Sequence, residues 1–233
     1  MKENDKYRHE LKYICSEEQI ADLTVRLNAL LTLDKHVESG SYNIRSMYFD
    51  NLENRCYFEN EDGTNPREKY RIRIYNHSSD RITLECKQKK NGMTHKTSCL
   101  LSMKDYDDIL NRRLLEDLES KPALLRKFHL LMQTQLYKPS IIVDYDRTPY
   151  VFKEGNVRIT IDKNIRSSTD FSGFFKKNIH SRPIQPTNQH LIEVKYDEFL
   201  PEFIKSSLQT GELQRVTFSK FYLCKKFSTG GLL

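Results

Sequence analysis

The sequence is poor in the residues and segments that mark fibrous, disordered or membrane proteins. Its 233 residues include only 8 glycines and 7 prolines, far fewer than a collagen-like or low-complexity chain carries. No apolar run approaches the roughly 18–20 residues of a transmembrane helix. The amino-terminal residues MKENDKYRHE are polar and lack the apolar stretch of a signal peptide. These absences predict a soluble, cytoplasmic protein without a membrane span.

Several common active-site signatures are missing as well. The five cysteines form no CxxC pair, and no zinc-type spacing with histidine occurs, so we expect reduced, mostly buried thiols. There is no G-x-x-x-x-G-K-[ST] loop, which excludes a P-loop kinase, and no G-x-S-x-G elbow. Chemistry that depends on a nucleophilic side chain is therefore not indicated.

The chain has enough apolar and aromatic mass for a substantial core, with 13 tyrosines and 12 phenylalanines. At about 150 residues per domain the length allows one large domain. Because no internal repeat and no Gly- or Ser-rich linker occurs, we expect a single domain over residues 1–233. The net charge of +6 fits an anionic ligand as well as an ordinary solvated surface. The placement of the cations has to decide between the two.

Hydrophobic periodicity predicts strands alternating with a few helices. Strands are expected at residues 6–14, 42–49, 67–75, 81–90, 93–101, 138–150, 156–166 and 189–197. Helices are expected at 16–31, 102–111 and 116–132 (broken at Pro122), after Pro201 and at 217–228, with a short helix or turn at 51–59 and a long loop at 167–188. Ser16 is the expected N-cap of the first helix, and Asn91-Gly92 predicts a tight hairpin. The order of elements indicates an α+β fold.

Charged residues recur at every second position of these strands. Because alternate residues of a strand face the same side of a sheet, Arg71 and Arg73 share one face, whereas Ile72 and Ile74 share the other. For a single strand this pattern describes a sheet with one solvated side. Its recurrence in six strands, rich in arginine and in Glu-x-Lys pairs, favours an anion-binding face, because the guanidinium fork matches phosphate oxygens.

If the sheet closes into a barrel, these faces turn inward. The cations of the lumen would be Lys12, Arg71, Arg73, Lys87, Arg147, Arg158 and Lys195, and its acids Glu10, Glu85 and Glu193. An unpaired ion taken out of water costs on the order of several kcal/mol. Such an excess of cations is tolerable only where water and a polyanion enter. The sequence therefore predicts an antiparallel β-barrel tunnel with flanking helices, suited to a chain of phosphates.

The acids of this lumen point to a divalent metal. Mg²⁺ or Mn²⁺ is usually held by one or two carboxylates together with phosphate oxygens and water. Glu193, in the middle of LIEVKY, is the first candidate ligand, followed by Glu10 and Glu85. The alternative for each is a carboxylate that only orients an arginine through an ion pair.

Nine short motifs follow one another along nearly the whole chain. They are YRHELKY (7–13), IRSMYFD (44–50), KYRIRIY (69–75), LECKQK (84–89), HK (95–96), VDYDR (143–147), VRITID (157–162), LIEVKY (191–196) and FSKF (218–221). In this order they resemble the VTC domain. That is the polyphosphate polymerase domain of vacuolar transporter chaperone proteins, within the triphosphate tunnel metalloenzymes, or CYTH superfamily.

The resemblance implies a tunnel capped by helices that transfers the γ-phosphate of ATP onto a growing polyphosphate chain. The residues it implies in phosphate binding and catalysis are Lys12, Arg71, Arg73, Lys87, Lys96, Arg147, Arg158, Lys195 and Lys220. Arg71, Arg73, Lys87 and Arg158 are the expected contacts to the nucleotide phosphates. Glu193 is the implied metal ligand. Lys96 and Lys220 come from the resemblance alone.

One departure from the superfamily pattern separates two of the possible activities. The opening signature ExExK reads RHELK here, because Arg8 replaces the first acid. This resembles the VTC branch and weakens the case for a two-metal hydrolase.

Three hypotheses remain for the function. The leading one is a Mn²⁺- or Mg²⁺-dependent phosphotransferase that makes polyphosphate from ATP. The second is hydrolysis of a triphosphate in the same tunnel, and the third is a polyphosphate-binding module without turnover. ATP, triphosphate or polyphosphate are the expected partners, nucleic acid is not expected, and a protein partner is left open. In the polymerase hypothesis Lys96, Lys195 and Lys220 form a basic track for the acceptor chain.

Overall fold

The computed structural model describes residues 8–35, 37, 40–209 and 213–228. Its strands are β1 (His9–Ser16), β2 (Thr32–Leu33), β3 (Tyr42–Asp50), β4 (Arg67–Tyr75), β5 (Ile82–Lys90), β6 (Met93–Leu101), β7 (Lys138–Phe152), β8 (Val157–Ser168), β9 (Arg182–Pro183), β10 (Gln189–Tyr196) and β11 (Gln214–Arg215). Its α-helices are α1 (Glu17–Leu30), α2 (Arg55–Glu61), α3 (Met103–Leu110), α4 (Ala123–Thr134), α5 (Glu202–Ser207) and α6 (Lys220–Ser228). Short 3₁₀ turns lie at Leu118–Ser120, Glu154–Asn156 and Phe171–Gly173.

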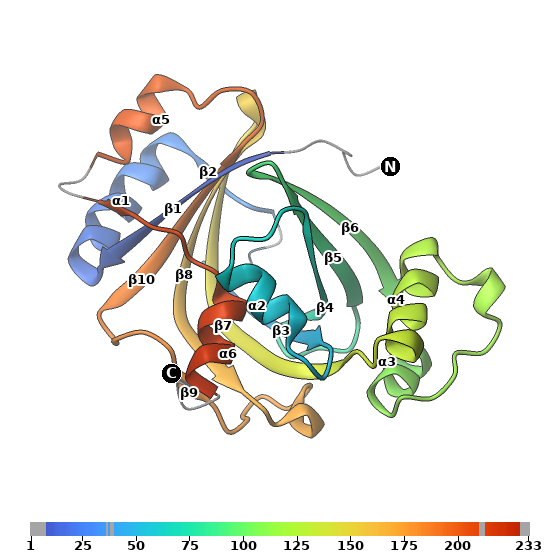
Figure 1. Cartoon of the computed structure of the whole chain (residues 1–233). Coiled ribbons are helices and arrows are strands. Elements are labelled where there is room, and N and C mark those ends of the chain that lie inside the picture. The colour runs from blue at the N-terminus through green and yellow to red at the C-terminus, as the bar shows by residue number, and fades with distance from the viewer. Residues whose placement is uncertain (1–7, 36, 38–39, 210–212, 229–233) are drawn as a thin grey trace.

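All strands belong to one antiparallel sheet, in the order β11-β1-β10-β8-β7-β3-β4-β5-β6, with β2 on β7 and β9 on β8. The sheet curves until β1 and β6 approach each other (Figure 1). Among the described residues they are joined by a single bridge between Arg8 and Thr94. The predicted α+β tunnel with flanking helices is confirmed, but its barrel is not closed by a continuous ladder.

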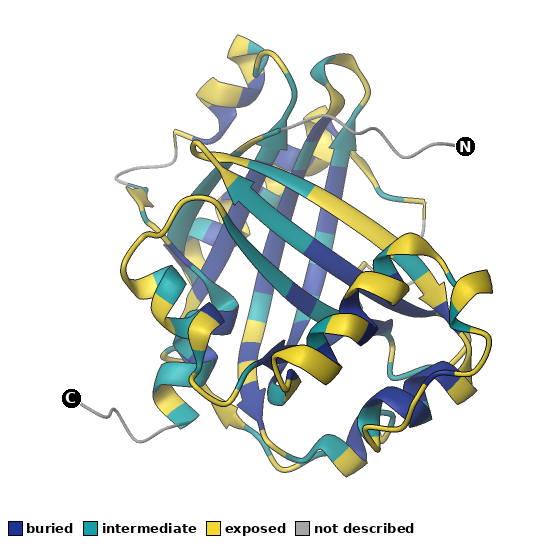
Figure 2. Ribbon diagram, turned by 45° about the vertical axis from the view of Figure 1, so that its right-hand side comes forward, coloured by how far each residue is buried: buried dark blue, intermediate teal, exposed yellow. Residues whose placement is uncertain are grey.

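Two hydrophobic clusters pack against this sheet. Ile20, Leu23 and Leu27 of α1 share one cluster with Ile159 of β8 and Ile192 of β10. The larger cluster joins α4 to β4 and β5. Figure 2 shows buried positions running along the central strands. Burying each such side chain stabilises the folded state by about 1.5–3 kcal/mol relative to exposure. The apolar positions of the strands therefore stabilise the sheet, and the alternate positions are left to polar side chains.

Local sequence signals fix several element ends as expected. Ser16 caps α1, and its hydroxyl accepts a hydrogen bond from the Gln19 amide while the Gln19 side chain accepts one from the Ser16 amide. This capping box satisfies two amides that the first turn leaves without helical partners. Asn91 and Gly92 have φ angles of 51° and 80°, the left-handed conformation that a tight hairpin between β5 and β6 requires.

The structure differs from the expected boundaries at several elements, including the chain's first strand and its last helix, and the α-helices expected at 51–59 and 116–132 begin at Arg55 and Ala123. β1 runs two residues beyond the expected end, and residues 6 and 7 of the expected range lie outside the described part of the chain. α6 begins at Lys220 instead of residue 217. The expected loop at 167–188 contains the short strand β9 and a 3₁₀ turn. None of the described helices has the length and apolarity needed to cross a membrane.

α2 and α6 lie against each other (Figure 1), and α2 also contacts β3 and β4. The rings of Tyr57 and Tyr222 stack with centroids 5.0 Å apart, and the Tyr222 hydroxyl donates to Glu61 at 2.9 Å. α6 also packs on β7 and β8. Its first residues are thereby held beside the polar face of the sheet, where the candidate site lies.

Candidate functional site

The centre of the polar face is a cluster of acids and lysines from β1, β5 and β10. In the β1–β10 register Glu10 pairs with Lys195, and Lys12 pairs with Glu193. Lys195 Nζ lies 2.9 Å from Glu193 Oε1, and Lys12 Nζ lies 2.8 Å from Glu10 Oε1. Lys87 of β5 reaches Glu10 Oε2 at 3.0 Å across the lumen. The structure therefore brings five of the predicted site residues into one cluster.

The positive surroundings keep both carboxylates of this cluster ionised. Burial alone would raise the pKa of Glu193, but Lys195, Lys12, Lys220 and Arg147 together hold it well below its usual value. Burial and the neighbouring Glu193 also raise the pKa of Glu10, and the nearby lysines reverse this, lowering it to about 2. Two adjacent acids that stay charged in a buried place are suited to hold a cation.

A second cluster joins β7, β8 and the start of α6. Arg147 donates to Asp162 through Nε and Nη2, both at 2.7 Å, and Lys220 Nζ lies 2.6 Å from the same carboxylate. Both cations also face Glu193, at 3.6 and 3.9 Å. Lys220 and Arg147 further lie over the ring of Tyr145. Lys220 is thus placed in the lumen beside Arg147, as the family resemblance implies.

Asp162 is the functional candidate that the sequence analysis did not name. Its side chain is fully buried, and two lumen cations converge on it. The alternation in VRITID does place Asp162 on the same face as Arg158, so strand parity carried the signal. The expected lumen charge of seven cations against three acids is thereby corrected to nine against four among these residues, since Lys96 and Lys220 also lie beside lumen acids.

The opposite wall, built from β3 to β6, gathers cations around one acid. Glu85 Oε2 accepts from Arg71, whose Nε and Nη2 lie at 2.7 and 2.6 Å. Arg73 and Lys96 lie 3.8 and 3.5 Å from the same carboxylate group. Arg71 also donates to the Tyr48 hydroxyl at 2.7 Å. Burial would raise the pKa of Tyr48, but Arg71 and Arg73 lower it below the usual value.

Arg158 lies apart from these clusters. It is the register partner of Lys195 in the β8–β10 pair, but its Nη2 lies 3.1 Å from Asp34, between β2 and β3, and donates to the Tyr42 hydroxyl at 3.1 Å. Its side chain is 35% exposed, more than those of Arg71 or Arg147. The structure thus places Arg158 nearer the edge of the lumen than the other predicted arginines.

The oxygen donors around Glu193 fit a hard divalent cation. Thr160 is the register partner of Glu193, and its buried hydroxyl has no hydrogen-bond partner among the described residues. With the carboxylates of Glu193 and Glu10 this gives the oxygen-only, carboxylate-poor donor set that Mg²⁺ or Mn²⁺ shares with phosphate oxygens and water. Among the described residues no group of three or more His, Cys, Asp or Glu side chains could hold a metal alone. A bound phosphate is needed to complete such a site.

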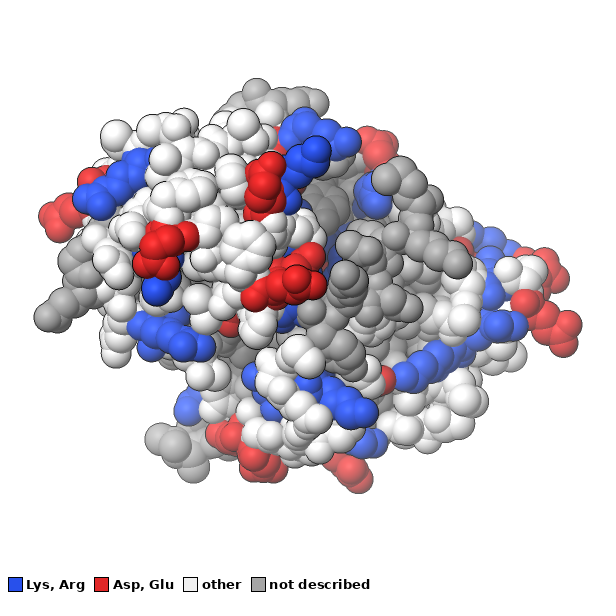
Figure 3. Space-filling view, turned by 90° about the horizontal axis from the view of Figure 1, so that it is seen from above, with Lys and Arg blue, Asp and Glu red and all other residues white. Residues whose placement is uncertain are grey.

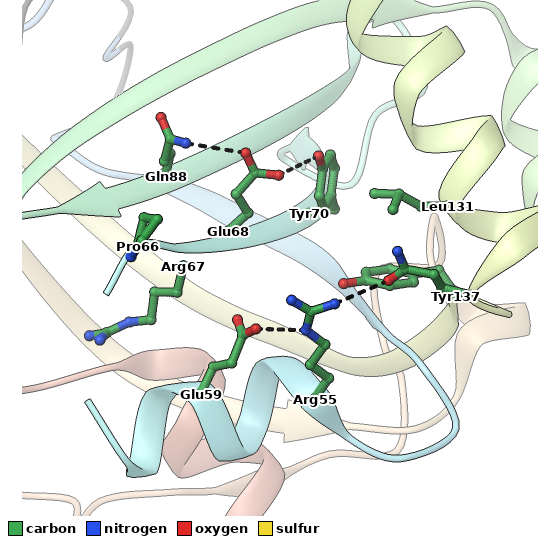
Figure 4. A pocket seen from close by; sticks show the side chains of 10 residues that line it. Arg55, Glu59, Pro66, Arg67, Glu68, Tyr70, Gln88, Leu131 and Tyr137 are labelled. Carbon is green, nitrogen blue, oxygen red and sulfur yellow. Dashed lines mark hydrogen bonds and ion pairs between the residues drawn. The ribbon is translucent and has the colours of Figure 1, made fainter. Parts of the chain in front are cut away.

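Charged side chains gather at the end of the molecule that Figure 3 shows. Seen from above, the surface is hollowed, and basic and acidic side chains surround the hollow (Figure 3). A separate pocket lies on the outer side of β4 and β5, between α2 and α4 (Figure 4). Its polar groups are occupied, because Arg55 pairs with Glu59 at 2.7 Å and Glu68 accepts from Tyr70 at 2.8 Å. The inner clusters are the candidate site.

A family model for the VTC domain matches residues 7–228, almost the full chain. The chain belongs to the VTC domain family. Membership agrees with the motif order and with the tunnel. A search of curated protein sequences finds no match.

Solved structures with the same fold are distant in sequence. A candidate adenylate cyclase from Bacillus halodurans aligns with a TM-score of 0.52 and 16% identity over 88% of this chain and 87% of its own. A candidate adenylyl cyclase from Hippeastrum, described as having a dominant triphosphatase activity, aligns with a TM-score of 0.53 and 14% identity over 97% and 98%. At these identities the likeness of this VTC domain to both establishes the fold alone.

Proposed function

We propose that this VTC domain is a divalent-metal-dependent phosphotransferase that makes inorganic polyphosphate from the γ-phosphate of ATP. One observation carries the proposal: cations from β1, β4 to β7, β10 and α6 converge on one lumen, with the adjacent acids Glu193 and Glu10 between them. Cations alone would suit any polyanion. The ionised acid pair among them gives a metal a place beside the phosphates.

The lumen cations bind and orient the phosphate chains in this mechanism. Arg71 and Arg73 present guanidinium groups to the donor triphosphate, while Lys12, Lys195 and Lys220 surround the acids on the facing wall. Their charges stabilise the negative charge that spreads over the transferred phosphoryl group. Glu193 and Glu10 would hold the metal ion, which when bound supplies further charge neutralisation at the phosphate oxygens.

No protein nucleophile is needed for this reaction. A terminal oxygen of the acceptor chain forms a bond to the γ-phosphorus of ATP, and the bond from that phosphorus to the β–γ bridging oxygen breaks, so that ADP leaves. Catalysis then rests on positioning and on preorganised charge. In the free protein the lumen acids neutralise part of the cations, and an incoming phosphate chain replaces the acids as their partner.

The predicted basic track is divided between the two walls. Lys195 and Lys220 both face Glu193, at 2.9 and 3.9 Å, whereas Lys96 pairs with Glu85 on the opposite wall. An acceptor chain that touches all three would cross the lumen. A chain that crosses the lumen in this way would bring its acceptor end close to Glu193 and Glu10. There it would compete with water for the γ-phosphate.

Hydrolysis in the same lumen is the alternative activity. The same cations and acids would serve it, and the fold is shared with the Hippeastrum protein that is described as a triphosphatase. A binding module without turnover is the third candidate, but it has no use for ionised acids among its cations.

A time course with γ-labelled ATP and Mn²⁺ or Mg²⁺, resolving polymer from orthophosphate, distinguishes the three. We expect long-chain product from the wild type, and Lys220→Ala should shift the product ratio towards orthophosphate. Lys226→Ala is the matched control, since it removes the same charge from the same helix at a side chain that lies over Tyr222. Orthophosphate as the sole product across metals and ATP concentrations would establish the hydrolase. Polyanion binding without any product would establish the binding module.

A further inference from the structure

Lys69 differs from every cation of the lumen described above. Lys12, Arg71, Arg73, Lys87, Lys96, Arg147, Arg158, Lys195 and Lys220 each lie within 4.0 Å of a carboxylate. Lys69 faces the same lumen, yet its Nζ has no described carboxylate within that distance. It donates to Asn60 Oδ1 of α2 and to Ser219 Oγ at 3.3 Å, and it lies 5.1 Å from the centre of the Phe221 ring.

The strand register sets Lys69 in a row of like charges. Lys69 of β4 is directly opposite Lys87 of β5, and Lys87 is directly opposite Lys96 of β6. Like charges in directly opposed positions destabilise a sheet. Glu10 compensates Lys87 and Glu85 compensates Lys96, so Lys69 is the member of the row without an acid. A row of this kind is stabilised when an anion lies across it.

The two uncharged partners of Lys69 keep its ammonium group in place without neutralising it. Asn60 Oδ1 and Ser219 Oγ fix the direction of Nζ, and Ser219 adjoins Lys220, whose own ammonium pairs with Asp162. Arg71 and Arg73 follow Lys69 on the same face of β4, at steps of about 6.6 Å for two residues. Lys69 therefore extends the arginine row by one position.

We propose that Lys69, with Lys87 and the Ser219 hydroxyl, forms a further anion subsite that binds a phosphate group of a linear polyphosphate beyond the groups held by Arg71 and Arg73. This inference rests on the proposed function, because it assumes a phosphate chain in the lumen. It adds a contact that a tripolyphosphate is too short to use fully.

The charge state of Lys69 couples this subsite to pH. Burial, with Arg67 on β4, Lys87 on β5 and Lys12 on β1, lowers the pKa of Lys69 to about 7, and Cys56 on α2 opposes this shift weakly. A phosphate anion beside Nζ favours the protonated form. Binding of the longer chain at about pH 8 should therefore be accompanied by uptake of close to one proton at Lys69.

The test is calorimetric binding of tripolyphosphate and of a longer linear polyphosphate, without ATP, in two buffers that differ in ionisation enthalpy. Lys69→Met should weaken binding of the longer chain at least ~10-fold, and of tripolyphosphate less than ~3-fold, since a hydrogen bond from a charged group is lost. Lys127→Met, which removes a lysine paired with Glu68 on the outer side, should bind both ligands as the wild type does. Lys69→Arg should retain affinity and lose the proton uptake, because guanidinium stays charged.

Three outcomes would overturn this inference: unchanged binding of the longer chain by Lys69→Met, equal losses for both ligands, or equal proton uptake by the wild type and Lys69→Arg. Thermal melting of each variant establishes that it is folded. If the wild type binds neither ligand, the proposed function fails as well, so the two failures are distinguishable.

Discussion

The two walls of the tunnel differ in how many acids face their cations. On the wall of β1, β7, β8 and β10, three acids (Glu10, Asp162 and Glu193) face the cations. On the wall of β4 to β6, Glu85 is the one acid among the described ion pairs of the lumen, and three cations share it. The first wall has carboxylate oxygens to offer a metal, whereas the second has cations to offer a phosphate chain.

Glu85 and Glu193, one on each wall, have different surroundings. Glu85 lies against two guanidinium groups and an ammonium group, which leaves its oxygens engaged. Glu193 faces three cations at 2.9 to 3.9 Å and lies close to Glu10. It is also next to the Thr160 hydroxyl, which has no hydrogen-bond partner in the described part of the chain. Of the three candidate metal ligands, the geometry favours Glu193 with Glu10 and gives Glu85 the part of an ion-pair partner.

The largest expected effect tests this division directly. Glu193→Gln should abolish metal-dependent turnover, at least ~10³-fold, yet bind polyphosphate as well as the wild type or better, because it removes a negative charge from a cationic lumen. Glu85→Gln should instead retain metal dependence and lose stability by about 3 kcal/mol, since Arg71 and Arg73 would keep their burial without the acid. Turnover with Mn²⁺ and chemical denaturation measure the two.

Normal turnover by Glu193→Gln would show that this residue is structural and that the wall of β1 and β10 is not the metal side. Loss of metal dependence in Glu85→Gln, with unchanged stability, would exchange the roles of the two walls.

A smaller effect is expected from the arginines, graded by their place in the lumen. Arg71→Ala should weaken triphosphate binding more than ~10-fold, because Arg71 is held in the lumen by Glu85 and Tyr48. Arg158→Ala should cost about 3-fold, since this side chain pairs with Asp34 near the edge and is 35% exposed. Titration calorimetry with tripolyphosphate measures both. Unchanged affinity in both variants would contradict the tunnel as the phosphate site.

The smallest expected effect is on the stability of the protein at low pH. The pKa of Glu10 is lowered from 4.5 to about 2 in the folded protein, so its contribution to stability is complete above about pH 4.5 and is lost as the pH falls towards 2. Glu10→Gln should flatten the acid side of the stability curve by about 1 kcal/mol, a figure reduced for the partial exposure of the pair. Thermal unfolding in a pH series checks it, and parallel curves for the two proteins would show that Glu10 is not paired in solution.

Strand periodicity predicts which side of a strand such as β4 faces the lumen. The alternation in KYRIRIY places Arg71 and Arg73 inward and Ile72 and Ile74 outward, as the structure has them. The inward parity of Asp162 was also visible, but parity within one strand does not say which side chain on another strand it meets. That depends on register between strands far apart in sequence, such as Arg147 opposite Asp162.

Other parts of the site depend on contacts that no periodic pattern encodes. The partner of Arg158 is Asp34, in a segment between β2 and β3 without alternation. The start of α6 is moved to Lys220 in a segment where Lys12 donates to the carbonyl of Phe218 at 2.7 Å. The incomplete closure of the barrel follows from how far β1 and β6 diverge, which neither strand's sequence specifies.

The gap between β1 and β6 affects how a long linear polymer could reach the lumen. A barrel closed by continuous hydrogen bonding can take up a long linear molecule only if one end of that molecule passes through an opening of the barrel. Each binding event would then require a free chain end. Where the described parts of β1 and β6 meet, one backbone bridge joins Arg8 and Thr94, and the ion pair of Lys87 with Glu10 spans the same gap from β5. A backbone hydrogen bond contributes only about 1 kcal/mol. If the domain makes polyphosphate as proposed, a chain would enter or leave sideways through this gap, and its length would set no topological barrier to exchange.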